Sequence, residues 1–421
     1  MDAPEIKSVF RLALRVGELL LANGAATRAV EATMQQVARS YGLPRCYPNA
    51  SFTSLSLSLD HPDLDYPLTE IRRVRQHATN YHHLVMVSAL VERLQRDKLS
   101  PEAALSALEE LESKPVNDPL WVRLLGWAGV CAASTLLLGG NVVEIVICFL
   151  IVLPAQFCRQ WIAEKDVPSP VGDMFAAFFV TAVALIISRG PLAANTNLVI
   201  AGSLFGLLPG AAIVSSAQDL IGGDLLSSAA RGLEALLTGA AIAAGVGFTL
   251  DIGVHLSLGA EVSRAVTVGW AWPWQIGAAC VVSLCYGRAL SIPRSALLYA
   301  GLIGGCGWLI SLLIPQSGGQ ELLLATLLST LVVGCISRLI AALQRIPVIV
   351  YTIPGVVPFL PGYTVYQGML AIVKGQSTNG VVLLIQAVAI AGTIAMGIAL
   401  SSFIDPTLTH LRHALPMQRK G

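Results

Sequence analysis

The chain has 421 residues, of which 54% are hydrophobic and only 13% are charged, and its formal net charge at pH 7 is +1. A soluble core cannot bury so large an apolar fraction, so the composition predicts an integral membrane protein. A nearly neutral chain without a basic cluster is not expected to bind nucleic acid. Residues 1–120 hold 28 of the 53 charged side chains, which predicts a soluble domain followed by a membrane domain.

Residues 1–115 are expected to form a cytoplasmic α+β domain, because the first 20 residues are too charged for a secretory signal. Apolar side chains at helical spacing predict a helix over residues 8–22, and a second amphipathic helix follows it. The alternating Ser-Leu sequence of residues 54–59 predicts a strand. A third helix is expected over residues 69–96, and a fourth is expected to begin after Ser100.

The rest of the chain, after a predicted linker at residues 116–120, is expected to cross the membrane about ten times. Each apolar window has the length that a bilayer crossing requires. With the amino terminus inside, the loops carry eleven Lys and Arg residues on the inner side and three on the outer side, which favours two cytoplasmic termini and a cytoplasmic tail at residues 406–421. The predicted spans cover residues 122–138, 141–160, 172–188, 197–218, 227–250, 270–288, 296–315, 321–341, 347–371 and 381–404.

The two halves of the membrane domain, residues 121–251 and 252–405, resemble each other. A shift of 152 positions superimposes Leu208-Pro209-Gly210 on Leu360-Pro361-Gly362. Five spans are an odd number, so the second half is expected to enter the membrane in the opposite orientation. We therefore predict an α-helical polytopic membrane protein with two inverted five-helix repeats, an architecture typical of secondary transporters.

Pro-Gly pairs fall inside the fourth and ninth predicted spans, and each is expected to interrupt its helix. Interrupted helices expose backbone groups near the middle of the membrane, where they can bind charged groups of a substrate. A simple proline kink is the alternative for either helix alone. The predicted substrate-binding residues are Pro209, Gly210, Ser215, Asp219, Pro361, Gly362 and Gln367.

Ionisable side chains in and near the spans are the candidates for ion binding and gating. Asp219 lies ten residues past the first Pro-Gly pair, which makes it the candidate for binding a substrate amine or a proton. Asp224 and Arg231 are expected to form a cytoplasmic gate, with a solvated turn as the alternative for Asp224. Glu144 and Asp173 are further proton-relay candidates, with an interfacial or paired role as the alternative for each.

Motifs for soluble enzyme chemistry are absent from the sequence. There is no P-loop, esterase, zinc-protease or dinucleotide motif, so an ion gradient is the expected energy source. The eight cysteines form no CxxC pair, and the seven that lie in or beside apolar segments are interpreted as small core residues, so neither a metal nor a cofactor is expected. Two other function classes are a hydrolase that uses the His77 to His83 region and a membrane-anchored sensor.

Four stretches in the same order carry a resemblance to a known family over nearly the whole chain. The first is Gly17 to Glu31, and the second is Asn80 and Leu84 with the turn Leu99 to Ala103. The third is Leu208-Pro209-Gly210 with Asp219 and Gly223-Asp224, and the fourth is Pro347 to Tyr366. Together they resemble the threonine/serine exporter family, with its two halves fused in one polypeptide. Members usually have Arg directly before the Val-Glu pair, whereas this chain has Ala29 there and Arg28 one position earlier.

The resemblance implies export of small polar amino acids, threonine and serine, driven by the proton motive force. For members split into two subunits it implies export of dicarboxylates such as succinate, which is the alternative here. The chain is therefore expected to be a multi-pass antiporter of a bacterial cytoplasmic membrane rather than an enzyme. Protons are its expected coupling ion, and a homo-oligomer is left open.

Overall fold

The computed structural model describes residues 3–60, 66–74, 80–113, 118–165, 167–187, 189–190, 194–221, 223–256, 269–315 and 319–404. His77, linker residues 116–117 and the predicted tail at residues 406–421 lie outside the described residues. Helices dominate the described part of the chain, and its strands all lie in the first 73 residues.

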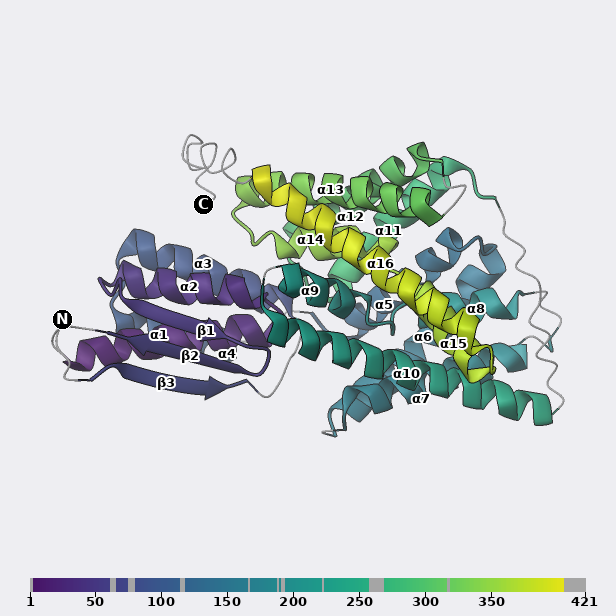
Figure 1. The fold of residues 1–421 in the computed structure, drawn as a ribbon, viewed down its shortest axis with the longest axis horizontal. Helices are drawn as coiled ribbons and strands as arrows, with labels where there is room; N and C mark the ends of the chain where they lie inside the picture. Colours follow the sequence, from purple (N-terminus) through teal and green to yellow (C-terminus); the bar gives the residue numbers. More distant parts are fainter. Residues whose placement is uncertain are drawn as a thin grey trace.

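The amino-terminal elements form one group at an end of the molecule, on the left in Figure 1. Three antiparallel strands pair in the order β1-β2-β3, and Leu55, Leu57 and Leu59 of β2 are buried while the alternating serines are not. This alternation is the pattern that predicted the strand. The elements are α1 (Ala3–Ala22), α2 (Thr27–Ser40), β1 (Cys46–Ala50), β2 (Ser54–Leu59), β3 (Leu68–Arg73), α3 (Tyr81–Asp97) and α4 (Pro101–Ser113).

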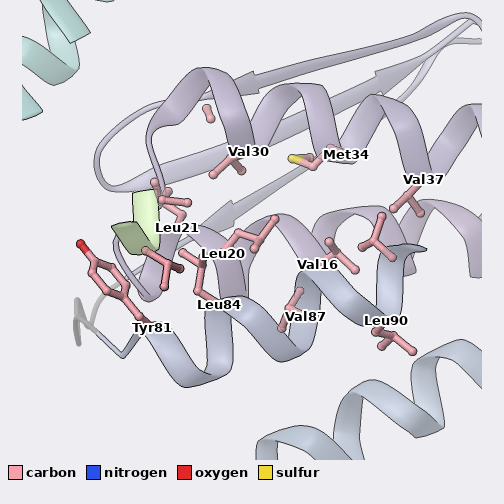
Figure 2. Close-up of a cluster of buried hydrophobic side chains, with 14 of the residues drawn as sticks. Val16, Leu20, Leu21, Val30, Met34, Val37, Tyr81, Leu84, Val87 and Leu90 are labelled. Carbon is pink, nitrogen blue, oxygen red and sulfur yellow. The ribbon is translucent and has the colours of Figure 1, made fainter. Parts of the chain in front are cut away.

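Helices α1, α2 and α3 pack around a shared apolar core, shown in Figure 2. Val16 and Leu20 of α1 lie between Val30 and Met34 of α2 and the apolar face of α3. The approach of α1 to α2 requires Gly17, because a Cβ at this position would lie 2.5 Å from the sulfur of Met34. The helical spacing of apolar residues therefore predicts this core correctly.

The predicted third helix is wrong over its first part. Residues 69–73 belong to β3, which pairs with β2, and α3 begins only at Tyr81. Pairing with the open edge of β2 satisfies the backbone of this segment, which has few apolar side chains to hold a helix against the core. The start of α3 is fixed by Asn80, whose side chain accepts hydrogen bonds from the backbone N–H groups of His82 and His83.

The remaining helices form the membrane part of the protein. They are α5 (Leu120–Leu137), α6 (Val142–Ala163), α7 (Ser169–Ile187), α8 (Thr196–Leu204), α9 (Gly210–Ile221), α10 (Leu225–His255), α11 (Trp272–Ala289), α12 (Arg294–Leu313), α13 (Gly319–Gln344), α14 (Ile349–Val356), α15 (Gly362–Val373) and α16 (Ser377–Ser401), with short 3₁₀ helices at Val357–Phe359 and Ser402–Ile404.

Seven helices in the described part of the chain are long and apolar enough to cross a membrane, which confirms a helical polytopic membrane protein. Large apolar side chains such as Leu150, Leu233 and Ile385 are exposed on them, as contact with lipid requires. The seven are Leu120–Leu137, Val142–Ala163, Ser169–Ile187, Leu225–Gly253, Arg294–Leu313, Glu321–Gln344 and Ser377–Ser401.

The fourth and ninth predicted spans are each divided into two shorter helices. Pro209 separates α8 from α9, and Pro361 separates the 3₁₀ turn after α14 from α15. Each proline carbonyl accepts the first hydrogen bond of the following helix, from Ile213 at 3.0 Å and from Val365 at 2.9 Å. The Pro-Gly pairs therefore interrupt the two helices and do more than kink them.

Helix bounds recur at a spacing of 152 residues. The bounds of α5 and α11 differ by 152 at both ends, and so do those of α9 and α15. The packing recurs too: α9 lies against α10 and α16, α15 lies against α16 and α10, and α5 lies against α11. In Figure 1 the long helices α10 and α16 run beside the shorter α9 and α15.

The turns after α9 and α15 have the same geometry. Gly223 and Gly375 have positive φ angles of 85° and 79°, which a side chain would disfavour. In both turns, the backbone N–H of the residue after the glycine donates a hydrogen bond to the carbonyl oxygen five residues earlier. Asp224 donates to Asp219 and Gln376 donates to Ala371, each at 2.9 Å. Both helices thus end in a Schellman motif at equivalent positions.

Candidate functional site

A cavity of about 290 Å³ lies between α9, α10, α15 and α16. Its walls are contributed by equivalent positions of the two halves, so it lies where the halves meet. This volume is just below the range of about 300–1,000 Å³ that is common for small-molecule pockets. The lining includes the equivalent pairs Ile213 and Val365, Gly232 and Leu384, Ala235 and Ala387, Leu236 and Val388, and Gly239 and Ala391.

The two Pro-Gly breaks approach each other. A Cβ on Gly362 would lie 2.8 Å from Cδ1 of Leu208, the residue before the first break. Glycine is therefore needed at the start of α15 for the two interrupted helices to meet. Helices α9 and α15 both begin at these breaks, so the positive ends of their dipoles lie there.

Two serines give the cavity a polar end. Ser216 of α9 donates a hydrogen bond to the carbonyl oxygen of Ser228 on α10 at 2.6 Å, and the two hydroxyl oxygens lie 3.3 Å apart. The equivalent positions of the second half are Gly368 and Gly380, where a Cβ on Gly380 would lie 2.6 Å from the carbonyl oxygen of Gly368. Among the described lining residues, those with hydroxyl groups, Ser216 and Ser228, both come from the first half.

An ion pair lies one helical turn beyond these serines. Arg231 Nε of α10 is 2.9 Å from Asp219 Oδ2 of α9, and only 12% and 5% of the two side chains are exposed. Among the described residues, neither of these two atoms has a hydrogen-bond partner with favourable alignment. Opposite charge brings these two atoms together without a well-aligned hydrogen bond between them, so a ligand with polar groups can compete for both partners.

Asp224 lies directly before α10 and caps its first turn. Its side chain accepts a hydrogen bond from the backbone N–H of Ser227 at 3.0 Å and so caps α10. Burial raises the pKa of Asp224, but hydrogen bonds from Ser227 and Thr27 and the charge of Arg231 outweigh burial and hold the pKa below its usual range. The structure thus pairs Arg231 with Asp219, while Asp224 stabilises the turn.

The other predicted site residues lie away from the cavity lining. Ser215 and Gln367 are partly exposed and do not line the cavity. Glu144 is buried at the start of α6, where its carboxylate accepts hydrogen bonds from the backbone N–H groups of Asn141 and Asn195. Asp173 of α7 is buried and pairs with Arg159 of α6. These contacts explain why Glu144 and Asp173 are buried. Asp219 and Arg231 do not line the cavity themselves, but each lies three residues after a serine that does.

Sequence reasoning missed Ser216 and Ser228 as cavity residues. Their helical spacing carried the signal, because Ser216 lies three residues before Asp219, and Ser228 lies three residues before Arg231. Each serine therefore lies on the same helix face as one partner of the ion pair.

Two family models match the chain in succession. The one described as "Putative threonine/serine exporter" matches residues 11–253, and the one described as "Threonine/Serine exporter, ThrE" matches residues 275–404. The chain belongs to the threonine/serine exporter family. This membership confirms the resemblance, and together with the seven long apolar helices it supports a multi-pass membrane protein.

Relatives of the threonine/serine exporter family match nearly the whole chain. A "Probable threonine/serine exporter" of Mycobacterium tuberculosis is 27% identical over 97% of this chain and 79% of its own length. The "Threonine/serine exporter" of Corynebacterium glutamicum is 27% identical over 96% of this chain and 83% of its own length. A "Probable succinate transporter subunit YjjP" of Escherichia coli is 24% identical over 60% of this chain and 97% of its own length. No solved structure matches the chain.

Proposed function

We propose that this protein exports threonine and serine across the bacterial cell membrane in exchange for protons. The observation that carries the proposal is the buried Asp219–Arg231 ion pair beside the serine-lined end of the cavity. A zwitterionic amino acid offers an ammonium group to the carboxylate and a carboxylate to the guanidinium. The hydroxyl of threonine or serine finds hydrogen-bonding groups in Ser216 and Ser228.

Two inverted halves account for alternating access to this site. The recurrence of helix bounds at 152 residues and the reciprocal packing of α9 on α16 and α15 on α10 support a duplicated unit. Each unit has four continuous helices and one interrupted helix, so an odd number of crossings turns the second unit over. We infer ten crossings with both termini in the cytoplasm, as the distribution of Lys and Arg in the loops favours.

Competition at Asp219 couples substrate movement to proton movement. The carboxylate accepts either the substrate ammonium group or a proton, but not both at once. Export of the amino acid then leaves Asp219 ready to take up a proton on the outer side and release it inside. The proton gradient thereby supplies the free energy for export.

Succinate fits this site less well than an amino acid does. Its two carboxylates require two cationic partners. In the described part of the structure, Arg231 is paired with the acidic Asp219 and not with a second cation. Like charges at close range cost free energy, particularly where water is excluded. The relative named as a succinate transporter subunit therefore supports a shared fold more strongly than a shared substrate.

The Asp219→Asn variant tests the coupling role of this side chain. We expect it to abolish threonine export driven by a pH gradient in proteoliposomes, because an amide neither binds an ammonium ion strongly nor titrates. Asp251→Asn is the matched control, since Asp251 lies on α10 with 72% of its side chain exposed. Gradient-driven export by folded Asp219→Asn at the rate of Asp251→Asn would remove Asp219 from the mechanism.

A further inference from the structure

The amino-terminal domain is firmly attached to the second half of the membrane part. The backbone N–H of Tyr81, at the start of α3, donates a hydrogen bond to the carbonyl oxygen of Leu290, between α11 and α12, at 3.1 Å. One continuous cluster of buried apolar side chains extends from α1–α4 to residues of the second half such as Ile292, Ala296 and Val350. Glu92 and Arg345 add an ion pair at 3.4 Å. Burial of this apolar surface fixes the domain to the second half.

The same domain also contacts the first half, at the turn between α9 and α10. Arg28, in the first turn of α2, reaches this turn, since a Cβ on Gly223 would lie 3.4 Å from Arg28 Nη2. The ring of Phe52 lies against Arg231, with 5.3 Å between the guanidinium carbon and the ring centre. The domain thus bridges the two halves at the residue that pairs with Asp219.

Phe52 is presented by a hairpin turn of defined geometry. It lies between β1 and β2, where the backbone N–H of Ser51 donates to the carbonyl oxygen of Ser54 at 2.8 Å and the two serine hydroxyl oxygens lie 2.8 Å apart. The N–H of Val74 donates to the carbonyl oxygen of Thr53 at 2.9 Å. These bonds fix the tip of the hairpin, so the position of the Phe52 ring follows from the position of the whole domain.

Tyr81 places a second aromatic side chain of the domain near Arg231. Figure 2 shows Tyr81 at the edge of the domain core. Burial raises the pKa of Tyr81, nearby Tyr286 adds to the increase, and the positive charge of Arg231 acts in the opposite direction. The guanidinium of Arg231 therefore contacts the Asp219 carboxylate of α9 and the Phe52 ring of the domain, and its charge also acts on Tyr81.

We propose that Phe52 is a positioning residue of the cytoplasmic gate: its ring holds Arg231 on Asp219 while the cavity is closed toward the cytoplasm. This inference rests on the proposed function, because the two halves must move relative to each other in alternating access. A domain attached to the second half then moves Phe52 away from Arg231, which belongs to the first half. The cation–π contact is lost as the gate opens, which frees Arg231 to bind the substrate carboxylate.

Thiol labelling of the purified full-length protein in detergent measures access to the cavity directly. The reporter is Ser228→Cys, introduced after the eight native cysteines are replaced, because Ser228 lines the cavity and is buried. A charged, water-soluble thiol reagent reacts with this cysteine only when the gate opens. Phe52→Leu keeps an apolar side chain without the ring, and Phe52→Tyr keeps the ring.

We expect Phe52→Leu to increase the labelling rate about 5- to 30-fold, the factor that corresponds to loss of a partly desolvated cation–π contact. Phe52→Tyr and the matched control Tyr47→Leu, an aromatic residue of β1 that is 63% exposed, should label at the rate of the reporter alone. Phe52→Met carries the same expectation as Phe52→Leu and is used if the leucine variant does not fold.

An unchanged rate in Phe52→Leu or Phe52→Met would overturn the role of Phe52, and so would an equal increase in Tyr47→Leu. Threonine efflux by the wild-type protein, with Ser228 and Phe52 both unaltered, separates this inference from the proposed function. Efflux without any effect of Phe52 on labelling leaves export standing and refutes the gate residue. The expected labelling pattern without efflux supports control of the cavity by Phe52 and refutes threonine export.

Discussion

Removal of Arg231 and Asp219, singly and together, tests whether the buried pair is as strongly coupled as its geometry indicates. Arg231→Gln leaves the Asp219 carboxylate, 5% exposed, without its charged partner. Loss of one partner of a buried ion pair costs about 3–5 kcal/mol of unfolding free energy. Asp219→Asn together with Arg231→Gln removes both charges, so no unpaired charge stays buried. We expect a coupling free energy of about 2 kcal/mol between the two sites, within the range for residues in direct contact.

Unfolding in mixed detergent micelles, followed for the four proteins of the double-mutant cycle, measures this coupling. Glu92 and Arg345 provide the control cycle, because their side chains are 40% and 36% exposed and exposed pairs contribute about 0.2–1 kcal/mol. Water already screens the control pair, whereas it is excluded from Asp219 and Arg231. A coupling between Asp219 and Arg231 no larger than that between Glu92 and Arg345 would refute the reasoning.

Three further predictions concern stability, packing and substrate binding. Asp224→Ala should lower the unfolding free energy by about 1 kcal/mol near pH 7 through loss of the α10 cap. Because folding lowers the pKa of Asp224 from 3.8, this difference in unfolding free energy is present above pH 3.8 and should disappear as the pH falls through the folded-state pKa. A difference that does not change with pH would contradict this role of Asp224. Gly202→Ala should lower the unfolding free energy by about 1–3 kcal/mol, since its Cβ would overlap the hydroxyl of Thr135 on α5. Thermal unfolding of this variant with and without Thr135→Ala measures the effect. If Thr135→Ala restores no stability, the clash is not the cause. Ser216→Ala should raise KM for threonine about three- to tenfold through loss of one hydrogen bond, measured from the concentration dependence of efflux, and an unchanged KM would exclude Ser216 from substrate binding.

The sequence predicts the interrupted helices well because the cause is local. Proline lacks an N–H group and clashes with the preceding helical turn, and at Pro209 and Pro361 it is followed directly by glycine, whereas Pro154 without such a glycine stays inside the continuous helix α6. Gly223 likewise marks the end of α9 through its own backbone conformation. The length of the apolar windows identified the long membrane helices, because a bilayer crossing requires about 20 apolar residues in succession.

Tertiary contacts explain what the sequence did not predict. Residues 69–73 form a strand because β2 offers them an edge, which a local pattern does not reveal. Asp219 and Arg231 meet because the turn at Gly223 reverses the chain between α9 and α10, whereas Asp224 is used to cap α10. Phe52 reaches Arg231 only through docking of the amino-terminal domain, so the intervening sequence carries no periodic signal for this contact.

Efflux from proteoliposomes preloaded with labelled threonine, serine or succinate, with and without an imposed pH gradient, tests export most directly. The proposed mechanism predicts saturable loss of threonine and serine that accelerates when protons can move inward in exchange, with little loss of succinate. Loss of succinate alone would contradict recognition of a zwitterion by Asp219 and Arg231. Retention of all three solutes under every gradient, by protein shown to be folded, would contradict the proposed function itself.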